Sequence, residues 1–137
     1  MITHLLDTDT CIAVLRQRER AVTRISELPS QSCAVSSITV SSITVFELLS
    51  GVRKARNPDR EKTKMETLLA MVATLAFDET TAHASAQIRM DLESKGTPIG
   101  AYDLLIAGQA IAAGLILVTG NNAEFRRVPG LRIESWM

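Results

Sequence analysis

The chain has 137 residues, of which 46% are hydrophobic and 4% aromatic, and its 15 basic and 15 acidic residues give a formal net charge of zero. Because a typical domain has about 100 to 150 residues, we expect one domain over residues 1–137, and the zero net charge argues against a protein that coats nucleic acid through bulk positive charge. The N-terminal apolar run is broken by Asp7 and later apolar runs are too short to span a bilayer, so we expect a cytoplasmic protein without signal peptide or membrane contact.

The first half of the chain alternates short apolar runs with segments of helical spacing. Residues 2–6 predict a buried strand, and the chain then enters a helix that Asp9 or Thr10 can cap. Cys33 lies at the start of the next predicted strand, and neither it nor Cys11 has metal-ligand spacing, which favours two buried free thiols in a reducing compartment. The other expected elements are a helix at 19–28, a strand at 33–37, a helix at 43–55 and a helix at 57–72 that Asn57 caps and Pro58 opens.

The pentapeptide Ser-Ser-Ile-Thr-Val occurs twice in tandem, at residues 36–40 and 41–45. Two copies of five residues cannot form a stacking repeat. An odd insertion would exchange the two faces of a strand, so we expect the extra copy to be absorbed where a strand meets a helix.

The second half continues the alternation of strands and helices. Its expected elements are a strand at 75–77, a helix at 80–95 ended by Gly96, a nearly all-apolar helix at 101–113 ended by Gly114, a strand at 115–119 and a short strand at 131–133. This order predicts an α/β fold, with a central, mainly parallel β-sheet flanked by helices on both faces. Ligands of such sheets bind at the carboxyl ends of the strands.

Three apolar stretches each carry a single conspicuous carboxylate. Asp7 follows the first predicted strand, Glu47 is the only charged residue between residues 27 and 53, and Asp103 is the only one between residues 95 and 124. Taken singly, each has an ordinary explanation as a helix cap, a favourable charge in a first helical turn or a solvated side chain. Together they would meet at one edge of a parallel sheet, where a hard divalent cation would compensate their charge.

Four segments carry a family resemblance when they are taken in order: residues 5–9, 41–48, 99–107 and 117–125. Each is a weak motif alone, but the ordered set resembles the signature motifs of PIN-domain ribonucleases and, more narrowly, of the VapC toxins of bacterial toxin–antitoxin pairs. The likeness covers essentially the whole chain. It implies an endoribonuclease that uses Mg²⁺, with Mn²⁺ as an alternative, and leaves a 5′-phosphate on the cut RNA.

The resemblance also implies roles for individual residues. Asp7, Glu47 and Asp103 match the three acids that line the metal site and the catalytic centre. Asn121 stands where many PIN domains have a fourth acid, and Glu124 is the residue that could replace it as a metal ligand. Thr119 matches the hydroxyl residue that orients the acidic cluster.

The partners implied by the likeness are a VapB-type antitoxin, a second copy of the chain in a homodimer, and a structured RNA. The RNA is expected to be a transfer RNA, with the anticodon loop of initiator tRNA as the narrowest expectation, and DNA would be contacted only through the antitoxin. RNA at an acidic cleft needs surrounding cations. The candidates are Arg16, Arg18, Arg20, Arg24, Arg53, Lys54, Arg56, Arg126 and Arg127.

Two other functions stay open on sequence grounds. Residues 7–10, Asp-Thr-Asp-Thr, are similar to the Asp-x-Asp-x-Thr pattern of haloacid-dehalogenase-type phosphatases, although residues 120–137 contain neither the Lys nor the further Asp that such an enzyme needs. A PIN-like binding module without activity is the second alternative, because Asn121 weakens the acidic site.

Overall fold

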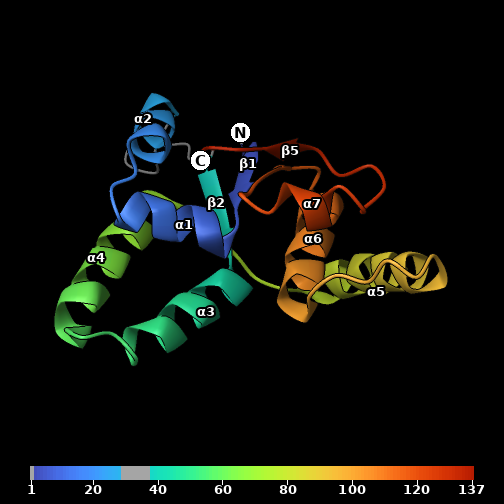
Figure 1. The fold of residues 1–137 in the computed structure, drawn as a ribbon, viewed down its shortest axis with the longest axis horizontal. Helices are drawn as coiled ribbons and strands as arrows, with labels where there is room; N and C mark the ends of the chain where they lie inside the picture. Colours follow the sequence, from blue (N-terminus) through green and yellow to red (C-terminus); the bar gives the residue numbers. More distant parts are fainter. Residues whose placement is uncertain (1, 29–37) are drawn as a thin grey trace.

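The computed structural model describes residues 2–28 and 38–137, in which short strands alternate with helices (Figure 1). The strands are β1 (His4–Leu6), β2 (Ile38–Ser41), β3 (Ala73–Leu75), β4 (Ile116–Val118) and β5 (Ile133–Glu134). The helices are α1 (Thr8–Leu15), α2 (Glu19–Glu27), α3 (Ser42–Val52), α4 (Pro58–Met71), α5 (Glu79–Ser94), α6 (Ala101–Ala113) and α7 (Asn122–Phe125).

The described strands form one five-stranded parallel sheet in the order β3-β2-β1-β4-β5. After β1 the chain therefore adds β2 and β3 on one side of this strand, and it then crosses over to add β4 and β5 on the other side. Such a reversal creates a crevice at the carboxyl ends of the two strands between which it occurs, here β1 and β4. The expected α/β architecture is confirmed, and its switch point lies directly after Leu6 and Val118, which are paired in register.

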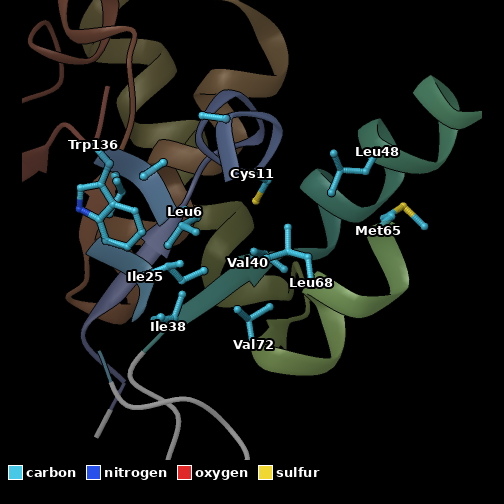
Figure 2. Close-up of a cluster of buried hydrophobic side chains, with 13 residues drawn as sticks. Leu6, Cys11, Ile25, Ile38, Val40, Leu48, Met65, Leu68, Val72 and Trp136 are labelled. Carbon is cyan, nitrogen blue, oxygen red and sulfur yellow. The ribbon is translucent and has the colours of Figure 1, made fainter. Parts of the chain in front are cut away.

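Alternate residues of the strands face two separate hydrophobic cores. Leu6 and Val118 belong to the core covered by α1–α4, whereas Leu5 and Leu117 belong to the core covered by α5, α6 and α7. Figure 2 shows the first core, with Leu6 among side chains from the helices and Trp136 at its border. Burying one large aliphatic side chain stabilises a fold by about 1.5 to 3 kcal/mol. Both cores therefore stabilise the packing of the helices on the two faces of the sheet.

The two copies of the duplicated pentapeptide adopt different secondary structures. Residues 38–40 of the first copy are strand β2, while residues 42–45 of the second copy are the first turn of α3, which Ser41 caps by accepting a hydrogen bond from the Ile43 N–H at 3.0 Å. The extra copy is thus absorbed at the junction of strand and helix, as expected.

The structure differs from the sequence expectations at the strand expected at 75–77, which lies at Ala73–Leu75, and at the cap of the first helix. The cap of α1 is Asp7, whose Oδ1 accepts from the Thr10 N–H at 2.8 Å, so the expectation that Asp9 or Thr10 caps this helix was wrong. The strand expected at 33–37, together with Cys33, lies outside the described residues. Cys11 is fully buried and not in a disulfide, in agreement with its expected role.

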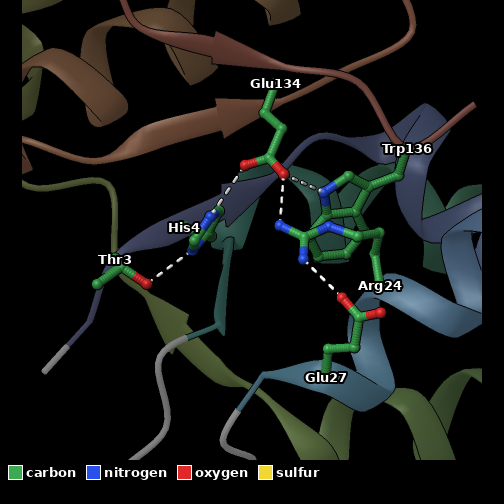
Figure 3. Close-up of polar contacts among 6 residues, drawn as sticks. All are labelled: Thr3, His4, Arg24, Glu27, Glu134 and Trp136. Carbon is green, nitrogen blue, oxygen red and sulfur yellow. Dashed lines mark hydrogen bonds and ion pairs between the residues drawn. The ribbon is translucent and has the colours of Figure 1, made fainter.

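A polar cluster joins the two ends of the described chain (Figure 3). The Glu134 carboxylate accepts hydrogen bonds from Arg24 at 2.6 Å and from the Trp136 indole at 3.1 Å, and its other oxygen lies 3.1 Å from Nε2 of His4. Arg24 also donates to Glu27 at 2.7 Å. Arg24 is therefore held in this cluster, which weakens its candidacy as an RNA contact.

Within the part of the chain that the structure describes, no helix is both long and apolar enough to cross a membrane.

Candidate active site

Asp7 and Thr119 meet at the switch point of the sheet because each directly follows one of its two central strands. The Asp7 N–H continues the strand pairing by donating to the Val118 carbonyl at 3.0 Å. The Thr119 hydroxyl hydrogen-bonds the Asp7 carboxylate and accepts from the Asn121 N–H at 2.9 Å. Thr119 thus fixes both the acid of β1 and the turn that follows β4.

Asp7 is a carboxylate in a buried position, with 3% of its surface exposed. Burial raises its pKa above the usual range for an aspartate, and the charge of nearby Asp9 adds to this effect. Hydrogen bonds from Thr119 and Thr10 oppose it because they stabilise the ionised form. A nearby cation would stabilise the ionised form of Asp7, which burial disfavours.

Asn121 brings the other two acids of this edge together. Its Nδ2 donates to Oδ2 of Asp103 at 3.3 Å and forms a short hydrogen bond with Oε2 of Glu124. Asp103 lies in the first turn of α6 and Glu124 in α7, where its second oxygen accepts from the Gly100 N–H at 3.3 Å. One amide group therefore holds two carboxylates, one from α6 and one from α7.

The two carboxyls held by Asn121 affect each other's ionisation. The pKa of Asp103 is raised to about 7 by burial and then by the hydrogen bond and charge of Glu124, with a further contribution from the charge of Asp7. Hydrogen bonds from Asn121 and Asp103 hold the pKa of Glu124 below its usual range. Near neutral pH the pair can therefore keep one proton.

Glu47 lies beside this cluster and is positioned by Thr8. The Thr8 hydroxyl lies 2.6 Å from Oε1 of Glu47, to which it can donate, and 3.2 Å from the Thr44 hydroxyl. Because Thr8 directly follows Asp7, it connects the acid of α3 to the end of β1. Sequence reasoning missed Thr8, although its place between two aspartates was a signal that could have found it.

The chemistry of these side chains fits a hard divalent cation, since carboxylate, hydroxyl and amide oxygens are the ligands that Mg²⁺ and Mn²⁺ prefer. Burial and, to a smaller extent, the charges of Glu124 and Asp7 raise the pKa of Asp103, and a nearby cation would offset both effects. Among the residues described here, however, no three His, Cys, Asp or Glu side chains are grouped closely enough to hold an ion together. Asp103 and Glu124 form a pair, Asp7 lies close enough for its charge to act on Asp103, and Glu47 is reached through Thr8.

The chain is similar to known proteins over nearly its whole length. The model of the family described as "PIN domain" matches residues 4–131. The tRNA(fMet)-specific endonuclease VapC of Salmonella typhimurium is 39% identical to the chain over 137 residues, which are 99% of each protein.

Two solved structures share the fold over the entire length of both chains. One is the DNA-bound VapBC of Salmonella typhimurium, with a TM-score of 0.91 and 38% identity. The other is VapBC2 of Rickettsia felis bound to a DNA fragment from its promoter, with a TM-score of 0.90 and 32% identity. These comparisons give no support to the phosphatase or to the inactive module.

Proposed function

This chain belongs to the PIN domain family, as a ribonuclease of the VapC type, and on that premise we propose that its acidic cluster cuts transfer RNA with Mg²⁺ or Mn²⁺. PIN nucleases in general depend on a divalent metal. The chain is the toxin of a toxin–antitoxin pair, and we take residues 1–137 as a single domain that acts in the cytoplasm, where its RNA substrate is found.

Each residue of the site has a distinct proposed role. Asp7, Asp103, Glu47 and Glu124 are the residues that would hold the metal. Once bound, a divalent ion of this kind activates water and neutralises charge on the phosphodiester.

The residues around the acids keep them in place. Thr119 orients Asp7 through its hydroxyl, Asn121 holds Asp103 and Glu124 together, and Thr8 aims Glu47. Asp103 must lose its proton before it can bind a cation. We place Thr119 and Asn121 in the catalytic centre as positioning residues.

The substrate is proposed from the relative that matches the chain over nearly its full length, whose printed name specifies tRNA(fMet). We therefore propose initiator tRNA, cut in the anticodon loop to leave a 5′-phosphate. The partners follow from the solved relatives, which are VapBC complexes with DNA. We propose a VapB-type antitoxin, DNA contact only through that antitoxin, and a homodimer of this chain.

The observation that carries the proposal is the pairing of Asp103 with Glu124 near the β1/β4 switch point, close enough to Asp7 for its charge to act on Asp103. Burial, and then Glu124 and Asp7, raise the pKa of Asp103 to about 7, a cost to the fold that a role in metal binding would explain. A guanidinium of the antitoxin could occupy the same place, because it pairs with carboxylates through two parallel hydrogen bonds and is always charged.

The test uses the full chain, purified free of antitoxin, and a transcript of initiator tRNA. We expect cleavage with Mg²⁺ or Mn²⁺, no cleavage with EDTA, and a loss in Asp7→Asn and Asp103→Asn larger than the roughly 10- to 100-fold that changes outside the ligand shell cost. Sequencing of the RNA ends identifies the cut. Circular dichroism establishes that both variants fold.

An intact tRNA pool after incubation with either metal would favour the inactive binding module instead. Release of phosphate from a small phosphomonoester, abolished by Asp9→Asn, would favour the phosphatase.

A further inference from the structure

A groove of about 530 Å³ lies between α1, α3 and α4, on the side of the sheet that these helices cover. In Figure 1 the three helices lie together to the left of the sheet. Apolar side chains from each of them line the groove, among them Ile12 of α1, Val52 of α3 and Met65 of α4. No aromatic residue is among the lining residues, so the groove offers no platform on which a base could stack.

Five cationic side chains gather around this groove from three parts of the chain: Arg16 after α1, Lys54 and Arg56 between α3 and α4, and Arg60 and Lys64 on α4. Two acids, Glu47 and Glu61, also line it, and Lys64 Nζ lies 3.7 Å from a carboxylate oxygen of Glu61. Cations therefore outnumber acids, although the whole chain has zero net charge. Such a local excess attracts a polyanion to this place and not to the surface in general.

The groove reaches the candidate active site at Glu47. This residue lines the groove, and its carboxylate lies 2.6 Å from the hydroxyl of Thr8, next to Asp7. A second hollow of about 410 Å³ shares Ile12 and Arg16 with the groove and is also lined by Arg18, Arg20 and the acid Asp9. Arg16 therefore lines both hollows, and the cations of the groove lie beside one acid of the site.

We propose that the groove between α1, α3 and α4 binds the sugar–phosphate backbone of the RNA substrate beside the cut, an inference that rests on the function proposed above. Arginine and lysine side chains at its rim contact phosphates, and the apolar lining packs against ribose. Contacts of this kind position an RNA by its shape and carry no base sequence information. The acids of the site cannot attract RNA themselves, so the neighbouring cations supply the affinity.

The test compares two double variants that remove equal charge. Arg56→Gln/Lys64→Gln removes two cations of the groove, whereas Lys62→Gln/Arg89→Gln removes two cations that lie elsewhere and pair with Glu66 and Glu93 on their own helices. Binding of full-length initiator tRNA to the full chain is measured in EDTA, which prevents cleavage, at several salt concentrations.

We expect the groove variant to bind tRNA at least about 10-fold more weakly, and its plot of log affinity against log salt to be less steep by about 1.5, because each lost phosphate contact removes about 0.7 to 0.9 from that slope. The control variant should bind within about twofold of the unchanged chain. With Mg²⁺ present, the groove variant should raise KM for full-length tRNA more than it lowers kcat, because the groove binds the substrate and does not carry out the cleavage.

Equal affinity of the two double variants for tRNA overturns the proposal, as does a lack of measurable tRNA binding by the unchanged chain. Unchanged tRNA affinity together with weaker capture of a VapB-type antitoxin assigns the groove to a protein partner instead and also overturns it. If the unchanged chain binds tRNA and only the groove variant binds it more weakly, but the unchanged chain does not cleave tRNA, the groove proposal stands and the proposed ribonuclease activity is contradicted. The failure of one proposal is thus distinguishable from the failure of the other.

Discussion

Asp103 is the residue of the site whose charge changes near neutral pH. Burial and the neighbouring Glu124 raise its pKa to about 7, so the folded chain holds a proton that the unfolded chain loses near the usual value of 3.8. Between these two values the folded state binds more protons, and the metal-free protein loses stability as the pH rises. The same proton competes with a metal ion.

We predict that Mn²⁺ affinity increases as the pH rises through about 7, and that binding releases protons, because Asp103 must ionise to coordinate the ion. Calorimetric titrations at about pH 6 and about pH 8, in buffers with different ionisation enthalpies, measure both quantities. Asp103→Asn should bind Mn²⁺ weakly at either pH and release fewer protons. Proton release by this variant equal to that of the unchanged chain would contradict the assignment.

Glu124 and Asn121 make different contributions to the same corner of the site. Glu124 supplies charge and oxygen, whereas the Asn121 amide donates to both Glu124 and Asp103. We predict that Asn121→Ala, a change outside the ligand shell, lowers metal affinity by about 10- to 100-fold and that Glu124→Gln lowers it more. Titration with Mn²⁺ compares them, and equal affinity in the two variants would remove Glu124 from the metal site.

The sequence predicts which acids reach the sheet edge but not how they are held. Asp7 follows a strand and Asp103 opens a helix, and both placements depend on local patterns that a sequence displays. The hydrogen bond between Thr8 and Glu47 joins residues 39 positions apart and depends on how α1 and α3 pack. The same holds for the amide bridge from Asn121 to Asp103 across 18 positions.

At the scale of elements, the duplicated pentapeptide shows why helices and strands are easier to predict than their ends. Ile38-Thr39-Val40 is a strand and Ile43-Thr44-Val45 is helical, although the residues are identical and β-branched. Intrinsic preference therefore does not decide the outcome. The first copy pairs with His4–Leu6 in the sheet, and the second begins at the point where Ser41 can cap a helix.

The packing of α5 on α6 depends on the absence of a side chain at Gly108. A Cβ at this position would lie 1.9 Å from the Ser85 hydroxyl and 2.9 Å from its Cα, which a change of rotamer cannot relieve. We predict that Gly108→Ala lowers the free energy of unfolding by about 1 to 3 kcal/mol, the usual cost of overpacking. Urea denaturation followed by circular dichroism measures it.

Gly51→Ala in α3 is the matched control, because a Cβ there meets nothing within 4 Å. It should raise the free energy of unfolding by up to about 1 kcal/mol through helix propensity. If Gly108→Ala were as stable as this control, the close approach of α5 and α6 would not be a constraint on the fold.

At the scale of the whole molecule, Glu134 ties together segments that are distant in the chain. It is in contact with His4, 130 positions away, and with Arg24, 110 positions away, and it accepts from the indole of Trp136 (Figure 3). Through these side chains the cluster ties β5 and α2 to β1, although β4 lies between β1 and β5 in the sheet. It therefore supports the sheet whose carboxyl-terminal edge carries Asp7.

Glu134→Gln keeps the shape of this side chain and removes its charge. Burial disfavours the ionised form, but hydrogen bonds from Arg24 and Trp136 outweigh it and hold the pKa of Glu134 below its usual range. Its stabilising effect is therefore fully present above about pH 4.5, the usual glutamate value, and disappears as the pH falls through the lower folded value. We predict a loss of about 1 to 3 kcal/mol near neutral pH, as expected for hydrogen bonds to a charged group.

Urea denaturation at about pH 7 and at about pH 3 tests this, with Glu27→Gln as the control. Glu27 binds the same guanidinium, but its side chain is 52% exposed, so its loss should cost less than about 1 kcal/mol. The difference between the two variants should be clear near neutral pH and shrink as the pH falls through the folded pKa of Glu134, which lies below the usual glutamate range. If the two variants were equally stable near neutral pH, the cluster would be an ordinary surface ion pair, and the last strand would owe its position to Trp136 and the sheet alone.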